Sequence, residues 1–459
     1  MEPVACGRMR SHDLIIIGAG SGNSIIGPEH DDMDVAIIER GLFGGTCLNV
    51  GCIPSKMLVY AAEIAELAGD VGPQLGLHTT FDGADWPAIR DRVFNRIDPI
   101  ASGGESYRKG LSNVTVYQDS AVFVGPKEIH VGDQTITADK IVIAAGARSW
   151  IPPIDGLETV GYQTSDTMMR LDEMPKRLAV IGGGYIATEL GNVFGLLGSD
   201  VTFLLRSDRM LRNEDETISA TFTEAYTKKF DVRTQTGIAS VRRDGDDIVL
   251  DLLPNHDELR VDEILVATGR IPNGDELQLA EHGYQLDGAG YLVTDAQLRT
   301  NVDGVFALGD ITNPVQLKHV ANHEARVVRH NLAHPDSMIE VNHRFVPHAV
   351  FGHPQVASVG MTEQDAAVSG HTYIAHVQEY ASAAYGWAME DTTSVVKLIM
   401  DTQTRTLLGA HICGPQASTL IQQLIQGMVF GQTVDQMAHE QYYIHPALPE
   451  VVEQALLEL

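Results

Sequence analysis

Cysteine is scarce in this chain of 459 residues, with only four, at positions 6, 47, 52 and 413. Four cysteines are too few for the disulfide framework of a secreted domain. They fit a protein of the reducing cytosol, where a disulfide is usually catalytic. Long apolar runs are also lacking, because none approaches the roughly 18 residues that cross a membrane. The residues before position 13 contain no apolar stretch of the secretory type. We therefore expect a cytoplasmic protein without a membrane partner.

Positive charge is in short supply as well. Lysine and arginine total 32 against 61 aspartates and glutamates, which gives a formal charge of -29. Such a chain repels phosphates at long range, so the composition argues against a nucleic-acid partner and makes any local cluster of arginines notable. A chain of this length, 44% hydrophobic, is too long for one ordinary core, and we expect several domains.

The N-terminal region carries the pattern of a dinucleotide-binding unit. An apolar run, 13–17, enters the glycine-rich stretch 18–23, and a second run, 35–38, ends at Glu39. We predict a strand, a glycine turn, a helix and a second strand followed by an acid. Such glycines allow a pyrophosphate to approach a helix N-terminus, and an acid about 20 residues later can hold a ribose hydroxyl. Asn23 replaces the third glycine of the fingerprint, although a small polar residue can still pack there.

The same pattern recurs in the middle of the chain. The run 178–181 enters a second glycine-rich stretch, 182–187, and a strand-like run follows at 201–205. Each unit continues into a similar strand and turn, at 141–148 and at 264–270. We therefore predict two related domains, the second inserted within the first.

The second unit differs from the first where its second strand ends. Three arginines stand there in place of an acid, at Arg206, Arg209 and Arg212. An acid suits the ribose 2′-hydroxyl of NADH, whereas arginines suit the 2′-phosphate of NADPH. In so acidic a chain, this cluster predicts NADPH.

The C-terminal part has a different pattern. A strand over 304–310 places Asp310 at its end, and an amphipathic helix over 324–331 returns the chain to the first domain. From about residue 342 the sequence predicts an α+β interface domain with a strand at 394–400 and helices near 418–430 and 448–457.

Two of the four cysteines lie five residues apart, in the run Gly-Gly-Thr-Cys-Leu-Asn-Val-Gly-Cys-Ile-Pro-Ser-Lys over 44–56. On a regular helix, Cys47 and Cys52 would point about 140° apart, so they can bond only in a distorted segment, and the disulfide should be easily reduced. Cys52 precedes a plausible helix start, where the helix dipole favours a thiolate. A pair of buried free thiols is one alternative. A zinc site is another, but neither Cys6 nor Cys413 has a companion at ligand spacing.

A dithiol between two dinucleotide sites implies that hydride passes from nicotinamide to a flavin and an electron pair then passes to the disulfide. Lys56, one helical turn beyond Cys52, would place an ammonium near the flavin, although a solvated lysine is the usual case elsewhere. His445 and Glu450 offer an imidazole and a carboxylate suited to general acid–base work. By itself this pair is weak evidence, because the chain has 18 histidines.

Together these motifs resemble the flavoprotein disulfide reductases, the family of glutathione reductase, lipoamide dehydrogenase and mercuric reductase, over nearly the whole chain after residue 12. The resemblance implies an α/β fold with two Rossmann-like dinucleotide-binding domains, for FAD and NADPH, and a C-terminal α+β dimerisation domain. The expected parts are a flexible tail at 1–12, the first part of the FAD domain with the dithiol at 13–157, the NADPH domain at 158–271, the second part of the FAD domain at 272–341 and the dimerisation domain at 342–459.

The resemblance also implies roles for individual residues. Cys47 would attack the substrate disulfide, Cys52 would contact the flavin, Lys56 would pair with Glu189 beside the flavin, and Tyr185 would cover the nicotinamide pocket. The expected FAD contacts are Gly18, Gly20, Ser21, Gly22, Glu39, Arg40, Gly45, Thr46, Lys56, Ala145, Gly146 and Asp310. The expected NADPH contacts are Gly182, Gly184, Tyr185, Ile186, Arg206, Arg209, Arg212, Gly269 and Arg270. No metal is expected.

The family resemblance also bears on substrate and assembly. His445 and Glu450 would come from the other subunit, which implies a homodimer with shared active sites. Pro28 stands where glutathione reductases carry a substrate-binding arginine, and the stretches 96–100, 318–326, 384–391 and 445–450 look like the mycothione reductases of the family. We therefore expect NADPH-dependent reduction of mycothione in thiol homeostasis, with Tyr107 and Arg326 lining the substrate cleft. The alternatives are a reductase of another small disulfide, such as glutathione disulfide, and a flavin electron carrier without disulfide turnover.

Overall fold

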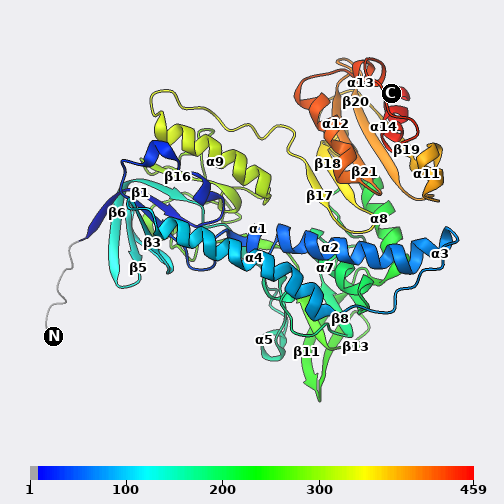
Figure 1. Cartoon of the computed structure of the whole chain (residues 1–459), viewed down its shortest axis with the longest axis horizontal. Helices are drawn as coiled ribbons and strands as arrows, with labels where there is room; N and C mark the ends of the chain where they lie inside the picture. The colour runs from blue at the N-terminus through cyan, green and yellow to red at the C-terminus, as the bar shows by residue number, and fades with distance from the viewer. Residues whose placement is uncertain (1–8) are drawn as a thin grey trace. The chain divides into compact units, whose positions relative to one another are not determined.

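The computed structural model describes residues 9–459, so Cys6 and most of the predicted tail lie outside the described residues. The chain forms two compact units, each built from three separate stretches (Figure 1). The first unit comprises residues up to Ser55, Arg90–Trp150 and Arg270–His343. The second comprises Lys56–Ile89, Ile151–Gly269 and Arg344–Leu459.

A parallel sheet forms the centre of the first unit. Its strands run in the order β3-β2-β1-β6, and β16 pairs with the second half of β6. Their apolar runs are almost entirely buried, as in a parallel sheet covered on both faces. Residues 10–12, expected in the tail, begin β1 instead, because their backbone continues the ladder with β6. The bounds are β1 (Arg10–Ile17), β2 (Val35–Ile38), β3 (Val114–Tyr117), β6 (Gln134–Ile143) and β16 (Val305–Ala307).

Helix α9 (Lys318–Ala333) covers one face of this sheet (Figure 1). Val328 and Leu332 of α9 pack in the same buried cluster as Leu14 and Ile16 of β1. Two antiparallel strands extend the sheet beside the first half of β6, and two short strands pair separately. These are β4 (Ala121–Gly125), β5 (Glu128–Val131), β7 (Ala147–Ser149) and β15 (Arg270–Pro272).

The helix predicted between the first two strands is wrong. The structure has only two short 3₁₀ turns there, Ser21–Ser24 and Pro28–His30. Gly27 and Pro28 explain the difference, because glycine weakens a helix and proline disfavours helical geometry in the residue before it, and Gly27 is extended with a φ of -142°.

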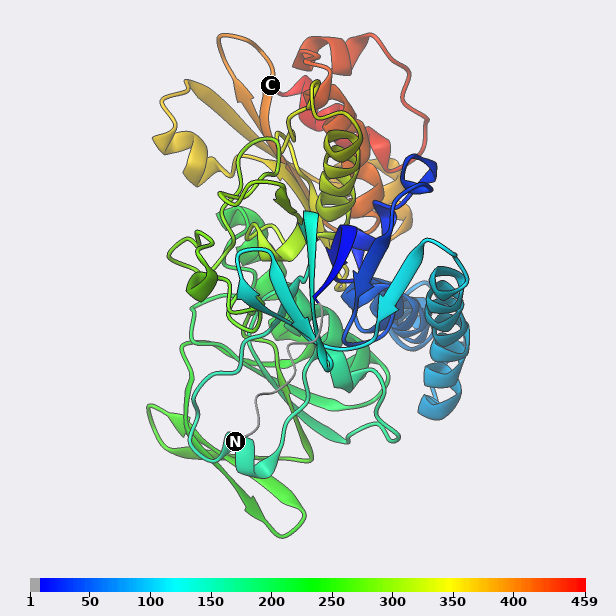
Figure 2. The ribbon, with the colours of Figure 1, turned by 90° about the vertical axis from the view of Figure 1, so that its left-hand side faces the viewer.

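The second unit repeats the parallel arrangement of the first. Its strands run β10-β9-β8-β14, with the same connections as β3-β2-β1-β6, which confirms the predicted duplication. A three-stranded antiparallel sheet, β11-β12-β13, follows and is drawn in green in Figure 2. The bounds are β8 (Arg177–Ile181), α7 (Tyr185–Leu196), β9 (Asp200–Leu204), α8 (Glu216–Lys229), β10 (Asp231–Arg233), β11 (Gly237–Asp244), β12 (Asp247–Leu253), β13 (Asp257–Val261) and β14 (Glu263–Val266).

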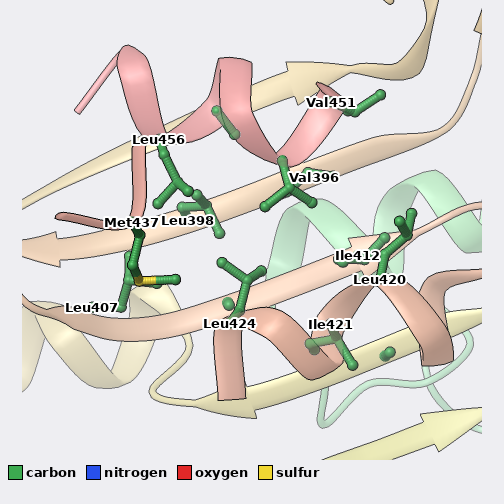
Figure 3. Close-up of a cluster of buried hydrophobic side chains, with 14 of the residues drawn as sticks. Val396, Leu398, Leu407, Ile412, Leu420, Ile421, Leu424, Met437, Val451 and Leu456 are labelled. Carbon is green, nitrogen blue, oxygen red and sulfur yellow. The ribbon is translucent and has the colours of Figure 1, made fainter. Parts of the chain in front are cut away.

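The C-terminal part of the second unit is an antiparallel sheet in the order β17-β18-β21-β20-β19, covered by helices. Figure 3 shows its core, where side chains of β20 and β21 meet those of α12 and α14. The strand and both helices predicted here are confirmed to within a few residues. The bounds are β17 (His348–Val350), β18 (Val356–Gly360), β19 (Tyr373–Glu379), β20 (Val395–Asp401), β21 (Leu407–Cys413), α12 (Ala417–Val429), α13 (Val434–His439) and α14 (Pro449–Leu457).

Further helices, among them α2 and the long α4, complete the described chain. Within residues 9–459, no helix combines the length and the apolar character that a membrane crossing requires. The remaining bounds are α1 (Gly45–Asn49), α2 (Cys52–Glu66), η3 (Leu67–Val71), α3 (Gly72–Gln74), α4 (Trp86–Lys109), α5 (Leu157–Val160), α6 (Ser165–Met168), η4 (Ala280–His282), η5 (Gly309–Ile311), α10 (Glu363–Val368), η6 (Tyr380–Ser382) and α11 (Ala384–Ala388).

Candidate active site

The first glycine turn begins directly at the end of β1. The Gly18 amide donates to the Ile38 carbonyl at 2.8 Å, and a Cβ on Gly18 would lie 2.3 Å from the Ala144 carbonyl oxygen. Only glycine therefore fits between the strand ends, and its φ of +103° also favours glycine. The Glu39 carboxylate accepts the amides of Ala19 and Gly41, each at 2.7 Å. The acid predicted to bind a ribose thus lies at the turn.

Asn23, the departure from the glycine fingerprint, has a structural function. Its side-chain oxygen accepts Arg108 Nε at 2.8 Å, and its carbonyl accepts Arg108 Nη2 at 2.7 Å. Arg108 lies near the end of α4, so the side chain that replaces the glycine fastens this helix to the turn.

The second glycine turn has the same geometry. The Gly182 amide donates to the Leu204 carbonyl at 3.0 Å, and a Cβ on Gly182 would lie 2.3 Å from the Ala267 carbonyl oxygen. A Cβ on Gly184 or Gly269 would meet no atom within 4 Å. These two glycines are therefore not required by packing, and their open sides leave room for a ligand. Tyr185 and Ile186 begin α7 at this turn, with Tyr185 43% exposed.

The three arginines of the predicted phosphate site lie on the segment between β9 and α8. Arg206 and Arg212 are exposed, whereas Arg209 forms an ion pair of 2.7 Å with Glu216 on α8. The Leu211 amide, beside Arg212, donates to the Gly183 carbonyl at 2.8 Å. This hydrogen bond holds the arginine segment against the glycine turn.

The dithiol lies across a break between two helices. Cys47 is in α1 and Cys52 begins α2, so the pair occupies the distorted segment and the helix start that the sequence predicted. A Cβ on Gly51 would lie 2.8 Å from the Thr46 carbonyl oxygen, so glycine allows the chain to turn back towards Cys47. The Asn49 amide supports the turn by donating to the carbonyls of Phe43 at 2.9 Å and Gly45 at 3.0 Å.

The two sulfur groups are in contact as thiols. Their hydrogen bond raises the pKa of Cys47, as do burial and the charge of Cys52, while the cation of Lys318 acts in the opposite direction. Cys47 is half-buried and Cys52 is exposed. The helix start beside Cys52 favours a thiolate there. The pair therefore combines a protonated, shielded thiol with an accessible one.

Lys56 and Glu189 form an ion pair of 2.5 Å, as expected from the family resemblance. Glu189 is buried, with 8% of its side chain exposed, and its other oxygen accepts the Phe351 amide at 3.0 Å. The Lys56 ammonium also lies over the Phe351 ring, 4.6 Å from its centre. The carboxylate and the ring thus fix the lysine that the sequence assigned to the flavin site.

Asp310 lies in η5, directly after β16. Burial raises the pKa of its carboxyl group, and the cations of Arg270 and Lys318 partly oppose that effect. A carboxyl group in this setting suits hydroxyl donors of a ligand. Arg270 itself donates to the Ala147 carbonyl at 2.5 Å, so the structure associates it with the same unit as Asp310, although the sequence assigned it to NADPH.

Sequence reasoning missed two residues of α9. Glu324 is fully buried. Its carboxylate accepts hydrogen bonds from the Gly309 backbone amide at 2.6 Å and the Asn313 side-chain amide at 2.9 Å, and it lies 2.8 Å from His343 Nε2. It therefore positions the turn that carries Asp310. Lys318 donates to the Ser21 hydroxyl at 3.0 Å, which links α9 to the first glycine turn. Both residues fall in the stretch 318–326, where no local signal in the sequence marks their roles.

The remaining predicted residues are placed as follows. Arg40 pairs with Glu276 at 2.5 Å, and the Ala145 carbonyl accepts the Asn273 side chain at 2.8 Å. Gly146, with a φ of +68°, has open space where a Cβ would stand. The two predicted substrate residues are both exposed. Tyr107 lies beside Arg108 on α4, and Arg326 lies 3.3 Å from His323 on α9.

His445 and Glu450 meet as predicted. His445 Nδ1 lies 2.7 Å from Glu450 Oε1, and the Ala447 amide donates to the other carboxylate oxygen at 3.2 Å. The hydrogen bond of His445 lowers the pKa of Glu450. The imidazole is 73% exposed, so its outer nitrogen faces away from its own chain. This arrangement suits a proton donor to a group outside the subunit.

Together these features fit a dinucleotide at each glycine turn. The first unit combines a glycine turn, a carboxylate at the strand end and a dithiol packed against the turn through Gly20 and Gly45. The second combines a glycine turn with exposed arginines. Within residues 9–459, no cluster of three or more candidate metal ligands is present.

Comparisons with known proteins agree with this geometry. The family model of the pyridine nucleotide-disulphide oxidoreductases matches residues 12–325, and the model of their dimerisation domain matches residues 346–456. Mycothione reductase of Mycobacterium tuberculosis (strain CDC 1551 / Oshkosh) is 46% identical over 463 residues, covering 98% of this chain and 100% of that protein. Mercuric reductase of Staphylococcus aureus is 34% identical over 93% of this chain and 78% of its own length. Among solved structures, the Cu(II) complex of the HOCl-induced flavoprotein disulfide reductase RclA from Escherichia coli is similar, with a TM-score of 0.87, 26% identity, and coverage of 98% of this chain and 100% of that one.

Proposed function

The chain belongs to the pyridine nucleotide-disulphide oxidoreductases, which use FAD and NAD(P)H, and on that basis we propose that it reduces mycothione to mycothiol with electrons from NADPH. The observation that carries the disulfide chemistry is the contact of Cys47 with Cys52 across the break between α1 and α2. The identity of 46% to a mycothione reductase over the whole chain supports the choice of substrate.

The substrate choice also has a chemical argument. Mycothione is the disulfide of a sugar-linked cysteine thiol, so it offers hydroxyls and amides and lacks the ionised carboxylates of glutathione disulfide. Pro28 begins the 3₁₀ turn Pro28–His30, at the position where glutathione reductases carry an arginine for a substrate carboxylate. Tyr107 and Arg326, both exposed, are proposed to line the cleft.

The two thiols divide the work. FAD, when bound, supplies the two-electron exchange between the nicotinamide and the dithiol. The Cys47 thiol passes its proton to an imidazole, and the resulting thiolate attacks one sulfur of the substrate, forming a mixed disulfide and releasing the first product thiolate. The Cys52 thiolate then attacks the Cys47 sulfur, which forms the Cys47–Cys52 disulfide and releases the second product thiolate. The first departing thiolate takes that proton back from the imidazolium, and the second takes a proton that the imidazole has gained from solvent.

That imidazolium is proposed to be His445 of the partner subunit. The match of residues 346–456 to a dimerisation domain supports a homodimer, and the exposed His445, oriented by Glu450, can serve a neighbouring active site. Each active site would then combine residues of both subunits.

The two nucleotides have separate proposed sites. Glu39, Asp310 and the first glycine turn would hold FAD, with Lys56 and Glu189 beside its reactive ring. The second glycine turn, with Arg206 and Arg212, would hold NADPH. We propose 13–157 and 272–341 as the FAD domain, 158–271 as the NADPH domain and 342–459 as the interface domain, in a protein of the cytoplasm.

The test is the anaerobic oxidation of NADPH by the holoenzyme, with NADH as control, against mycothione, oxidised glutathione and lipoamide offered separately. We expect efficient turnover only with mycothione and NADPH. Turnover with oxidised glutathione alone would retain the mechanism and overturn the substrate. Turnover with none of the three would contradict the proposed activity.

A further inference from the structure

The segment that carries the three arginines ends in two buried carboxylates, Glu214 and Asp215. Asp215 is completely buried and pairs with Lys397 of β20, whose side chain is only 3% exposed, at 2.8 Å. The same carboxylate accepts the amides of Thr217 and Glu363, each at 3.0 Å. Asp215 is thus both the N-cap of α8 and the partner of a buried lysine in the C-terminal sheet.

The lysine completes this junction. Its ammonium also lies 2.6 Å from Glu363 Oε2 and donates to the Thr217 hydroxyl at 2.9 Å. Burial alone would raise the pKa of Asp215, but the hydrogen bonds from Lys397 and the Glu363 amide outweigh it, and the pKa falls below its usual value. Asp215 is therefore ionised at neutral pH, and a charged pair lies in the interior.

Glu214 forms a second junction with the same sheet. Its two oxygens lie 2.6 Å from His348 Nε2 of β17 and 2.6 Å from the Ser358 hydroxyl of β18. Two consecutive carboxylates therefore join the arginine segment to three strands of the C-terminal sheet. Ion pairs of this kind add little net stability, but removing one partner leaves an uncompensated charge. Their geometric effect is to fix the backbone.

The segment needs such support. Leu211, between the second and third arginines, has a φ of +49°, which is unfavourable for a side chain with a Cβ. On one side its amide donates to the Gly183 carbonyl at 2.8 Å, and the Met210 carbonyl accepts the Ser219 hydroxyl at 2.6 Å. On the other side, the Leu211 carbonyl accepts the Glu214 amide at 2.9 Å, and the carboxylates of Glu214 and Asp215 anchor the segment to the C-terminal sheet. Arg212 thus directly follows a strained residue, in a backbone that is held at both ends.

We propose that Lys397, His348 and Ser358 are positioning residues for NADPH selectivity, acting through Glu214 and Asp215 on the arginines of the preceding segment. The C-terminal domain thereby contributes to nucleotide recognition without contacting the nucleotide. The inference rests on the proposed function, because it takes Arg206 and Arg212 as the contacts of the 2′-phosphate.

The decisive variant is Lys397→Met, which keeps the length and apolar stem of the side chain and removes its charge. Asp215 then lacks its ammonium, and the segment relaxes. A misplacement of about 1 Å that arises from a distant mutation can cost about a hundredfold in rate. We therefore expect the ratio of kcat/KM for NADPH to that for NADH to fall at least tenfold, through a higher KM for NADPH, with kcat unchanged. Affinity for adenosine 2′,5′-bisphosphate should fall, while that for AMP should not. A general loss of structure would instead lower kcat/KM for NADPH and for NADH together, and the ratio would not change.

Lys228→Met is the matched control. Lys228 forms an exposed ion pair with Glu224 on α8, at 2.7 Å, so the same substitution removes a charge from the helix that Asp215 caps. Its nucleotide ratio should equal that of the wild type. Ser358→Ala removes one hydrogen bond of Glu214. It should also lower the ratio of kcat/KM for NADPH to that for NADH, by a smaller factor than Lys397→Met.

The outcomes separate the two proposals. If wild-type enzyme shows no preference for NADPH, the nucleotide assignment of the proposed function is wrong. If the wild type prefers NADPH and folded Lys397→Met keeps its ratio, the positioning role alone is overturned. If Lys397→Met yields no folded holoenzyme, Ser358→Ala decides, and an unchanged ratio there rejects the inference.

Discussion

Gly45 packs so closely against Gly20 that a Cβ on Gly45 would stand 2.7 Å from the Gly20 Cα atom. This contact joins the helix of the redox cysteines to the glycine turn of the first nucleotide unit. Because α1 starts at Gly45, the position of Cys47 depends on the fit between two glycines.

Gly45→Ala should therefore separate the dithiol helix from the turn. Gly45 also has a φ of +65°, so an alanine there combines a steric clash with backbone strain of about 1–3 kcal/mol. We expect a lower free energy of unfolding in urea and a lower ratio of flavin to protein absorbance after gel filtration.

Gly103→Ala is the control for that substitution. Gly103 lies within α4, is exposed, and would have no atom within 4 Å of an added Cβ. Alanine should stabilise the helix by about 0.5–1 kcal/mol, with no change in bound flavin. Equal flavin loss in both variants would show that the contact of Gly45 with Gly20 has no special role.

The pKa of Cys47 gives a second prediction. The hydrogen bond and charge of Cys52 raise this pKa, so Cys52→Ala should lower it. In the reduced enzyme, alkylation of Cys47 by iodoacetamide should then begin at a lower pH than in wild type, because the thiolate is the reactive form. Peptide mass spectrometry across pH 6–10, about the range in which thiols titrate, would measure this. Cys413, fully buried in β21, is an internal reference that should react slowly in both proteins. An unchanged pH profile for Cys47 would contradict the coupling.

The proposed mechanism gives the two cysteines separate roles in turnover. Cys47→Ser should remove the nucleophile for the substrate while leaving flavin reduction by NADPH intact. Stopped-flow spectroscopy of the flavin and a product thiol assay would separate the half-reactions. Full thiol production by this variant would refute the assignment of Cys47.

The duplicated nucleotide units could be predicted from the sequence because their requirements are local. Gly18 and Gly182 each face a carbonyl oxygen at the end of a neighbouring strand, and no other residue fits. The absence of a helix after the first turn also has a local signal in the sequence. The Gly27-Pro28 pair indicates a turn, whereas the glycine fingerprint predicts a helix at the same place.

Long-range pairs carry no such signal. Asp215 and Lys397 are 182 residues apart, and neither lies in a sequence motif that predicts their contact. Likewise, Glu324 looks like one more polar residue of an amphipathic helix until the fold buries it beneath the Gly309 amide. For Lys56 and Glu189, only the family resemblance predicts the pairing. Burial of charge is decided by tertiary structure, and periodicity does not encode it.

The three arginines should differ in importance. Arg209 is engaged by Glu216, whereas Arg206 and Arg212 are exposed beside the second glycine turn. Arg206→Gln and Arg212→Gln should each raise the KM for NADPH about tenfold, with little effect on NADH, because charge-assisted bonds to a phosphate are lost. Arg209→Gln should have a smaller effect. Steady-state kinetics with both nucleotides would test this order, and a dominant effect of Arg209 would reverse the interpretation.

The contact between His445 and Glu450 gives a prediction specific to the second half-reaction. In Glu450→Gln, an acceptor for His445 Nδ1 remains, but the charge that stabilises a protonated imidazole is lost. General acid–base catalysis by a positioned side chain contributes about 10²–10⁴-fold, and weakening it should lower kcat with the disulfide substrate by about tenfold or more. Flavin reduction by NADPH should keep its wild-type rate, because that half-reaction needs no proton from His445.

Glu453→Gln, one turn further along α14, changes the same type of residue on the same helix and should leave both rates intact. A slower flavin reduction in Glu450→Gln would place the defect in the fold of the interface domain, since protonation of the departing thiolate has no part in that step.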